Sequence, residues 1–357
     1  MGIDNPLISR LGIRLPIIQA PMAGTSSPAM AAAASNSGAL GSLGVGSTDA
    51  AGARAMIAAV RERTSGPLNV NLFCHRPAIP NKAVETAWIE RLTPEFTALG
   101  ATPPTALTEI YRTFLDDEDM LAMLLEERPS VVSFHFGMPR ATWIRALREV
   151  GIILLASATN LQDARIVAAG GVHAIVAQGW EAGGHRGVFD TDAPDDRIGT
   201  MVLTRLFAQT LDLPIIAAGG MMDGTGIAAA LKLGASAAQL GTAFVAAEES
   251  LADQGYRATL ASDAANHTVM TRAISGRPAR GLANRFTAFG ATVSNRDIPA
   301  YPIAYDLGKA LNAAGKAKGE FGFGAQWAGQ GAPLSRPMPT AQLIATLAAE
   351  LEEAMRA

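Results

Sequence analysis

Residues 214–244 read PIIAAGGMMDGTGIAAALKLGASAAQLGTAF, and this stretch decides the fold class. It opens with a short apolar run of strand length, residues 214–218. Asp223 is a predicted N-cap for a helix over residues 226–233, and a second apolar strand covers residues 237–240. The order of strand, turn, helix, strand and turn predicts two consecutive βα units.

Small residues follow both strands of this stretch. Gly219 and Gly220 come after the first strand, and Gly241 and Thr242 come after the second. Glycine lets a backbone approach a ligand closely, and two such turns can direct backbone N–H groups at one phosphate. In a (β/α)8 barrel, the loops after strands seven and eight are the usual phosphate site. Two interpretations stay open here, a phosphate site or two ordinary tight turns.

The chain before this stretch alternates between apolar strands and helical segments. Residues 75–104 interrupt the alternation, because they hold five prolines and no clean period, and a helix over residues 105–127 resumes it. The six predicted upstream strands are residues 16–22, 40–45, 68–74, 131–136, 152–157 and 174–178. Eight apolar strands that alternate with helices predict an α/β fold, a TIM (β/α)8 barrel.

The pattern changes after residue 247. We predict a smaller α+β cap domain over residues 248–331, with strand-like pieces at residues 268–275 and 283–290. Residues 1–247 and 332–357 form the predicted barrel, to which the amphipathic terminal helix returns.

The composition narrows the partners. The formal net charge of −3 over 357 residues does not favour a nucleic-acid partner. No uncharged apolar run reaches the roughly 18 residues of a membrane span. Cys74 is the single cysteine, and the first residues lack the apolar core of a signal peptide. We therefore expect a cytoplasmic protein without disulfides or membrane contact.

Three amides are expected near the carboxyl ends of strands, where a barrel gathers its functional groups. They are Asn71, Gln178 and Gln239. Buried amides need partners, and a flavin ring offers alternating donors and acceptors. The alternative is that they pair with neighbouring backbone, but their convergence on one mouth favours a ligand.

Two histidines are placed near the same mouth. His135 lies inside an apolar strand, where it is either a functional group or a hydrogen-bonded core residue. His185, in EAGGHRG, lies in a predicted flexible loop beside Arg186 and could contact a phosphate or ribityl chain. No histidines show metal-ligand spacing, so we expect no metal site.

Tyr301, Tyr305 and Lys309 are spaced at i, i+4 and i+8, which places them near one face of a predicted helix. Two phenols and an ammonium group can bind a small anion. The alternative is an amphipathic helix with a tyrosine pair in its interface.

Several segments together resemble the nitronate monooxygenases, formerly called 2-nitropropane dioxygenases, and in particular the bacterial class I group. The combination of VSFHFG, EAGGHRG and a YPxxYxxxK helix is the most specific part, and the resemblance covers nearly the whole chain. The segments are PIIQAPMAG (16–24), NVNLF (69–73), VSFHFG (132–137), AQGWEAGGHRG (177–187), PIIAAGGMMDG (214–224), QLGTAF (239–244), GRPARGLANRF (276–286) and YPIAYDLGKALNAAG (301–315).

The resemblance implies noncovalent FMN and the oxidation of alkyl nitronates by O2, through a flavin semiquinone, to a carbonyl compound plus nitrite or nitrate. Propionate 3-nitronate is the implied substrate. His135 matches the family's active-site histidine, and Tyr301, Tyr305 and Lys309, with His185, match its substrate pocket. The implied FMN contacts are Pro21, Met22, Asn71, Gln178, Gly183, Gly219, Gly220, Gln239, Leu240, Gly241 and Thr242.

Two rival functions share these features. One is another FMN barrel, an NADH:quinone reductase or an enoyl-ACP reductase, and the other is a barrel that only stores or senses FMN. The sequence leaves open whether the chain is a monomer or a homodimer.

Overall fold

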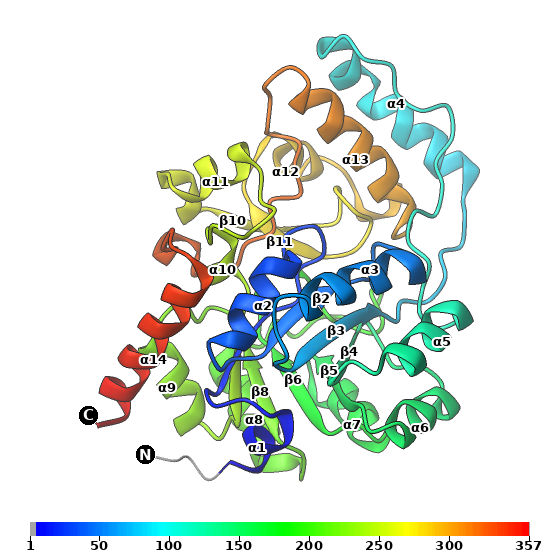
Figure 1. The fold of residues 1–357 in the computed structure, drawn as a ribbon. Helices are drawn as coiled ribbons and strands as arrows, with labels where there is room; N and C mark the ends of the chain where they lie inside the picture. The colour runs from blue at the N-terminus through cyan, green and yellow to red at the C-terminus, as the bar shows by residue number, and fades with distance from the viewer. Residues whose placement is uncertain (1–4, 357) are drawn as a thin grey trace.

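The computed structural model describes residues 5–356, so residues 1–4 and 357 of the predicted barrel lie outside the described residues. Eight strands form one parallel sheet in the order β1-β9-β8-β6-β5-β4-β3-β2, and a bridge between Ile18 and Leu40 joins its two edges. The strands are β1 (Ile17–Gln19), β2 (Gly41–Gly44), β3 (Leu68–Phe73), β4 (Val131–His135), β5 (Ile153–Ala158), β6 (Ala174–Gln178), β8 (Ile215–Ala218) and β9 (Ala237–Leu240). The predicted TIM barrel is therefore confirmed (Figure 1).

Helices surround the sheet and cover its apolar strands (Figure 1). Asp223 begins α9 as predicted, because its carboxylate accepts a hydrogen bond from the Gly226 N–H at 2.8 Å. The terminal helix α14 packs on α9 and α2. The helices are α1 (Pro6–Leu11), α2 (Pro28–Asn36), α3 (Ala50–Arg61), α5 (Glu118–Glu127), α6 (Ala141–Glu149), α7 (Leu161–Ala169), α8 (Thr200–Thr210), α9 (Gly224–Lys232), α10 (Thr242–Val245) and α14 (Thr340–Arg356).

A second layer lies above the carboxyl ends of the strands (Figure 1). It contains an antiparallel sheet in the order β10-β11-β7 and three helices. The predicted strand at residues 283–290 is wrong, because a capping box between Asn284 and Thr287 begins a helix there. The elements are β7 (Gly184–His185), β10 (Thr268–Thr271), β11 (Ala279–Leu282), α11 (Gln254–Leu260), α12 (Arg285–Gly290) and α13 (Ile303–Lys316).

The segment between β3 and β4 differs from the prediction. Residues 82–98 form a helix, α4 (Lys82–Ala98), in which Pro94 is accommodated. Its apolar face, which includes Trp88 and Phe96, shares a hydrophobic cluster with Leu307 of α13. Packing against another layer therefore outweighs the local signal of the prolines.

The predicted helix over residues 105–127 begins only at Glu118, after the N-cap Asp117. Residues 105–117 form a connecting loop instead. The Phe114 N–H donates to the Phe73 carbonyl at 2.8 Å, and the Thr108 N–H donates to Asp306 of α13 at 2.8 Å. These contacts hold the loop over the barrel mouth.

Candidate active site

One cavity of about 280 Å³ opens at the carboxyl ends of the barrel strands, close to the lower end of the range for ligand pockets. Its wall combines strand ends and turns of the barrel with side chains from the layer above. It includes all predicted site residues except Tyr301, namely Pro21, Met22, Asn71, His135, Gln178, Gly183, His185, Gly219, Gly220, Gln239, Leu240, Gly241, Thr242, Tyr305 and Lys309.

The two glycine-bearing turns lie at one side of this cavity. Gly219 and Gly220 have φ angles of 125° and 74°, which favour glycine. Within residues 5–356, no hydrogen-bond acceptor is found for the backbone N–H groups of Gly219, Gly220, Gly241 and Thr242. The Thr242 hydroxyl accepts from the Gly329 N–H at 2.9 Å and keeps its own proton for a ligand. The turns therefore offer a set of free donors to an anion.

The three amides converge on the cavity as expected, but they differ in their partners. Gln178 pairs with loop backbone, because its oxygen accepts from the Gly187 N–H at 2.7 Å and its nitrogen donates to the His185 carbonyl at 3.0 Å. Asn71 donates to the Ser133 hydroxyl at 2.9 Å. No hydrogen bond is found for the Gln239 side chain in the described part of the chain. Gln239 is therefore the amide most available to a ligand.

His135 is held by two protein contacts. Its Nε2 lies 3.1 Å from the His185 carbonyl oxygen, which only accepts, so this nitrogen carries the proton. Its Nδ1 then accepts from the Ser157 hydroxyl at 2.5 Å. Burial, together with the smaller effect of the nearby charges of Arg277 and Arg186, lowers the pKa of His135 to about 4. The imidazole is therefore neutral at neutral pH, with a fixed tautomer.

This geometry predicts an effect of Ser157→Ala. Without the hydroxyl donor, Nδ1 loses its partner and the ring is no longer confined to one orientation. Because one net hydrogen bond is worth about 1 kcal/mol, we expect kcat/KM to fall roughly fivefold. An unaltered kcat/KM would show that Ser157 does not orient His135.

His185 is not in a flexible loop, which corrects the sequence prediction. Gly184 and His185 form β7, which pairs with β11 at Arg280 and Ala279. The His185 Nε2 lies 2.9 Å from the Ser275 hydroxyl, and its ring lies 5.2 Å from the ring of Trp327 between centroids. The ring is thus fixed at the cavity wall.

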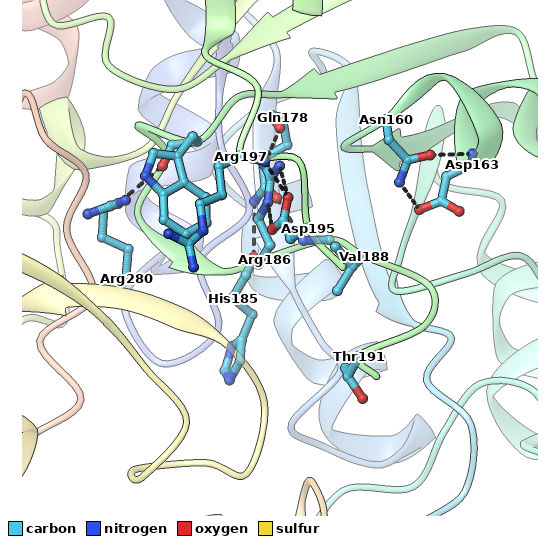
Figure 2. A network of polar contacts seen from close by, with 12 residues as sticks. Asn160, Asp163, Gln178, His185, Arg186, Val188, Thr191, Asp195, Arg197 and Arg280 are labelled. Atoms are coloured by element: carbon cyan, nitrogen blue, oxygen red, sulfur yellow. Dashed lines mark hydrogen bonds and ion pairs between the residues drawn. The ribbon is translucent and has the colours of Figure 1, made fainter. Parts of the chain in front are cut away.

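Arg186, next in the chain, is not free to bind a phosphate. It forms a bidentate ion pair with Asp195, with N–O distances of 2.8 and 3.0 Å. Figure 2 shows this pair, with the His185 ring projecting away from it. The pair closes the loop after β6, so that His185 lines the cavity and Arg186 does not.

The predicted Tyr301, Tyr305 and Lys309 face is only partly found. Helix α13 begins at Ile303, so Tyr301 precedes it and lies behind the cavity wall, against the rings of Phe136 and His185. Tyr305 and Lys309 do line the cavity. The Lys309 ammonium group lies 4.7 Å from the ring centroid of Tyr111 and 5.6 Å from that of Tyr305.

The cavity wall also contains residues that were not predicted. Tyr111 lies in the loop that was expected to be helical, and Trp327 and Gly329 lie in the glycine-rich segment that crosses above the turns. Phe73 is the last residue of β3 and Ser157 the penultimate residue of β5, so their positions near strand ends were a usable signal. Tyr111, together with Tyr305, forms an aromatic cover around Lys309.

The buried histidines predict a loss of stability in acid. Burial lowers the pKa of both His75 and His135 to about 4, below the ordinary value of 6.5. The unfolded chain therefore binds more protons between pH 6.5 and 4, and the folded state loses free energy as the pH falls through this window. Each histidine should cost roughly 2 kcal/mol between pH 7 and 5.

The measurement is the free energy of unfolding in urea at several pH values. His75→Leu removes one of these two imidazoles. The dependence of the free energy of unfolding on pH should then become weaker, by an amount that corresponds to the binding of up to one proton. A stability that is constant from pH 7 to 5 would contradict neutral burial of the two imidazoles.

In residues 5–356, no three histidine, cysteine, aspartate or glutamate side chains gather as metal ligands. None of the helices in that part of the chain is long and apolar enough to cross a membrane.

Known proteins are similar to this chain in sequence and in fold. The sequence profile of the family described as "Nitronate monooxygenase" matches residues 4–350. A nitronate monooxygenase of Paraburkholderia phytofirmans is 61% identical, covering 98% of this chain and 95% of its own. The Pseudomonas aeruginosa nitronate monooxygenase is 53% identical, with coverages of 96% and 97%. The nitroalkane oxidase of Streptomyces ansochromogenes superposes with a TM-score of 0.90 at 39% identity, covering 98% of this chain and 99% of its own. The chain therefore belongs to the nitronate monooxygenase family of oxidoreductases.

Proposed function

We propose that this chain binds FMN in the cavity and uses O2 to oxidise alkyl nitronates, such as propionate 3-nitronate, to a carbonyl compound plus nitrite or nitrate. One observation carries the proposal. The cavity has unbonded backbone N–H groups at its turns and Lys309 in its wall, and none of its described wall residues is a carboxylate. An anionic phosphate and an anionic substrate therefore both find complementary charge.

The residues present fit FMN. The N–H groups of Gly219, Gly220, Gly241 and Thr242 would hold its phosphate. Asn71, Gln178 and Gln239 would address the ring or the ribityl chain, and Pro21, Met22, Gly183 and Leu240 would supply wall contacts. Bound FMN supplies the electron transfer with the substrate and with oxygen.

The chain's own residues would bind and orient the substrate. A nitronate is already an anion, so it needs no strong base, and Lys309 supplies the opposite charge. Tyr305, His185 and Trp327 would cover the substrate and exclude water. His135 would hydrogen-bond the nitro group by exchanging one of its two protein contacts, and would act as a base only for neutral nitroalkanes. We assign Tyr301 a supporting position behind this wall.

The proposal includes a cytoplasmic monomer or homodimer, supported by the single buried cysteine and the modest net charge. Its rivals are reduction by NADH and flavin storage.

The test is anaerobic mixing of the purified yellow protein with propionate 3-nitronate and, separately, with NADH. We expect the flavin absorbance to change with the nitronate and to stay unchanged with NADH. Readmission of oxygen should then give nitrite or nitrate. Bleaching by NADH without a response to nitronate would overturn the proposal in favour of a reductase, and no response to either would favour storage.

A further inference from the structure

Arg277 is a buried arginine that lacks a carboxylate partner. It lies in the turn between β10 and β11 and is only 5% exposed. Its Nη2 donates to the Val188 carbonyl, and its Nε has no hydrogen-bond partner. Arg277 takes part in none of the ion pairs found within residues 5–356. Because an uncompensated buried charge is costly, its presence calls for a favourable interaction elsewhere.

One aromatic ring, that of Phe136, lies between the charged group of Arg277 and the histidines of the active site. The guanidinium carbon lies 4.1 Å from the ring centroid of Phe136. The Phe136 ring also contacts two histidines of the cavity wall. Its centroid lies 4.4 Å from the centroid of the His135 ring and 5.7 Å from that of the His185 ring. Phe136 has a φ angle of 74°, which side chains rarely adopt, so the backbone is strained where it places this ring.

The cation–π contact offsets part of the desolvation cost but does not cancel the charge. Its field reaches the cavity, since Arg277 contributes, after burial, to lowering the pKa of His135 and of His185. Lys309 is the single charged side chain among the described residues of the cavity wall. Arg277 is therefore a second source of positive potential, behind the wall near His135.

We propose that Arg277 is a positioning residue for the substrate: its charge, acting across the Phe136 ring, holds the anionic group of the substrate at the His135 side of the cavity. This inference depends on the proposed function, because it takes the substrate to be an anion. At an effective dielectric constant of about 20, a unit charge that acts from behind the Phe136 ring changes the affinity for a bound anion roughly tenfold.

A purely structural role provides the competing explanation. Arg277 donates to Val188, and Arg272 donates to the Thr191 carbonyl of the same loop. Val188 and Thr191 are both seen on this loop in Figure 2. Arg272→Met therefore removes an arginine that anchors the loop without removing the charge behind Phe136, and it is the matched control.

The experiment compares Arg277→Met, Arg277→Gln, Arg277→Lys and Arg272→Met as flavin-loaded proteins. Arg277→Gln keeps a donor for Val188, so it tests the charge if Arg277→Met fails to fold. Calorimetry gives the Kd of nitrate, a small planar anion, and steady-state kinetics give KM and kcat for propionate 3-nitronate and for neutral nitroethane.

We expect both neutral variants to raise the nitrate Kd and the nitronate KM about tenfold, with kcat and the nitroethane KM nearly unchanged. Arg277→Lys and Arg272→Met should stay within about threefold of the wild type. Equal weakening by Arg277→Lys, by Arg272→Met, or toward nitroethane would overturn the proposal, as would a wild type that binds no nitrate. Because nitrate binding needs no turnover, these results stay distinct from a failure of the proposed reaction.

Discussion

Gly220→Leu is expected to give a folded protein that no longer retains FMN. Gly220 has a φ angle of 74°, and a Cβ atom built there would lie 3.2 Å from the Glu181 Cβ. The added side chain thus points toward Glu181 rather than into the phosphate space. The strained turn must move, and with it the free N–H groups of Gly219 and Gly220.

The expected loss of FMN affinity follows from the displacement of those two N–H donors. Each hydrogen bond to a charged group is worth about 1.5–3 kcal/mol, so the loss of two weakens FMN binding roughly a hundredfold to ten-thousandfold. The measurement is the flavin content after gel filtration and the Kd for added FMN. Gly319→Leu is the matched control, because Gly319 has a φ angle of 73° and an open Cβ position away from the cavity. A Gly220→Leu protein that stays fully yellow would contradict the assigned phosphate grip.

Much of the barrel could be predicted, because its strands carry their own signals. Buried parallel strands read as short apolar runs, and caps such as Asp223 mark the helices between them. Helix α4 could not be predicted from local pattern, since Pro94 argues against it and its stability comes from packing on α13. The loop over residues 105–117 is likewise fixed by distant contacts, to Phe73 and Asp306.

The residues of the candidate site also divide into those with a local sequence signal and those placed only by tertiary contacts. Residues at strand ends, such as Asn71, His135 and Gln239, could be placed together because all parallel strands end at one face. Tyr111 and Trp327 could not, because their loops reach the cavity only through tertiary contacts. The helical spacing of Tyr301 was misleading, because α13 begins after it.

His135→Asn is expected to keep FMN bound and to slow nitronate oxidation by a factor of roughly ten to ten thousand. Its ring contacts Ser157 and the His185 carbonyl rather than the phosphate turns, so flavin retention should not depend on it. The measurements are flavin content and kcat/KM with propionate 3-nitronate and with neutral nitroethane. A colourless His135→Asn protein would instead make His135 a structural residue.

The two substrates separate the chemical roles of His135. A group whose pKa is about 4 is a weak base at neutral pH, so it is poorly suited to remove a proton from a nitroalkane carbon. As a neutral imidazole with its proton on Nε2, it is suited to donate one hydrogen bond to a nitro oxygen. If that is its role, both substrates should lose a similar factor in His135→Asn, because both carry the nitro oxygens. If nitroethane loses far more than the nitronate, His135 acts as a base, and the bound substrate must raise its pKa by displacing the Ser157 or His185 contact.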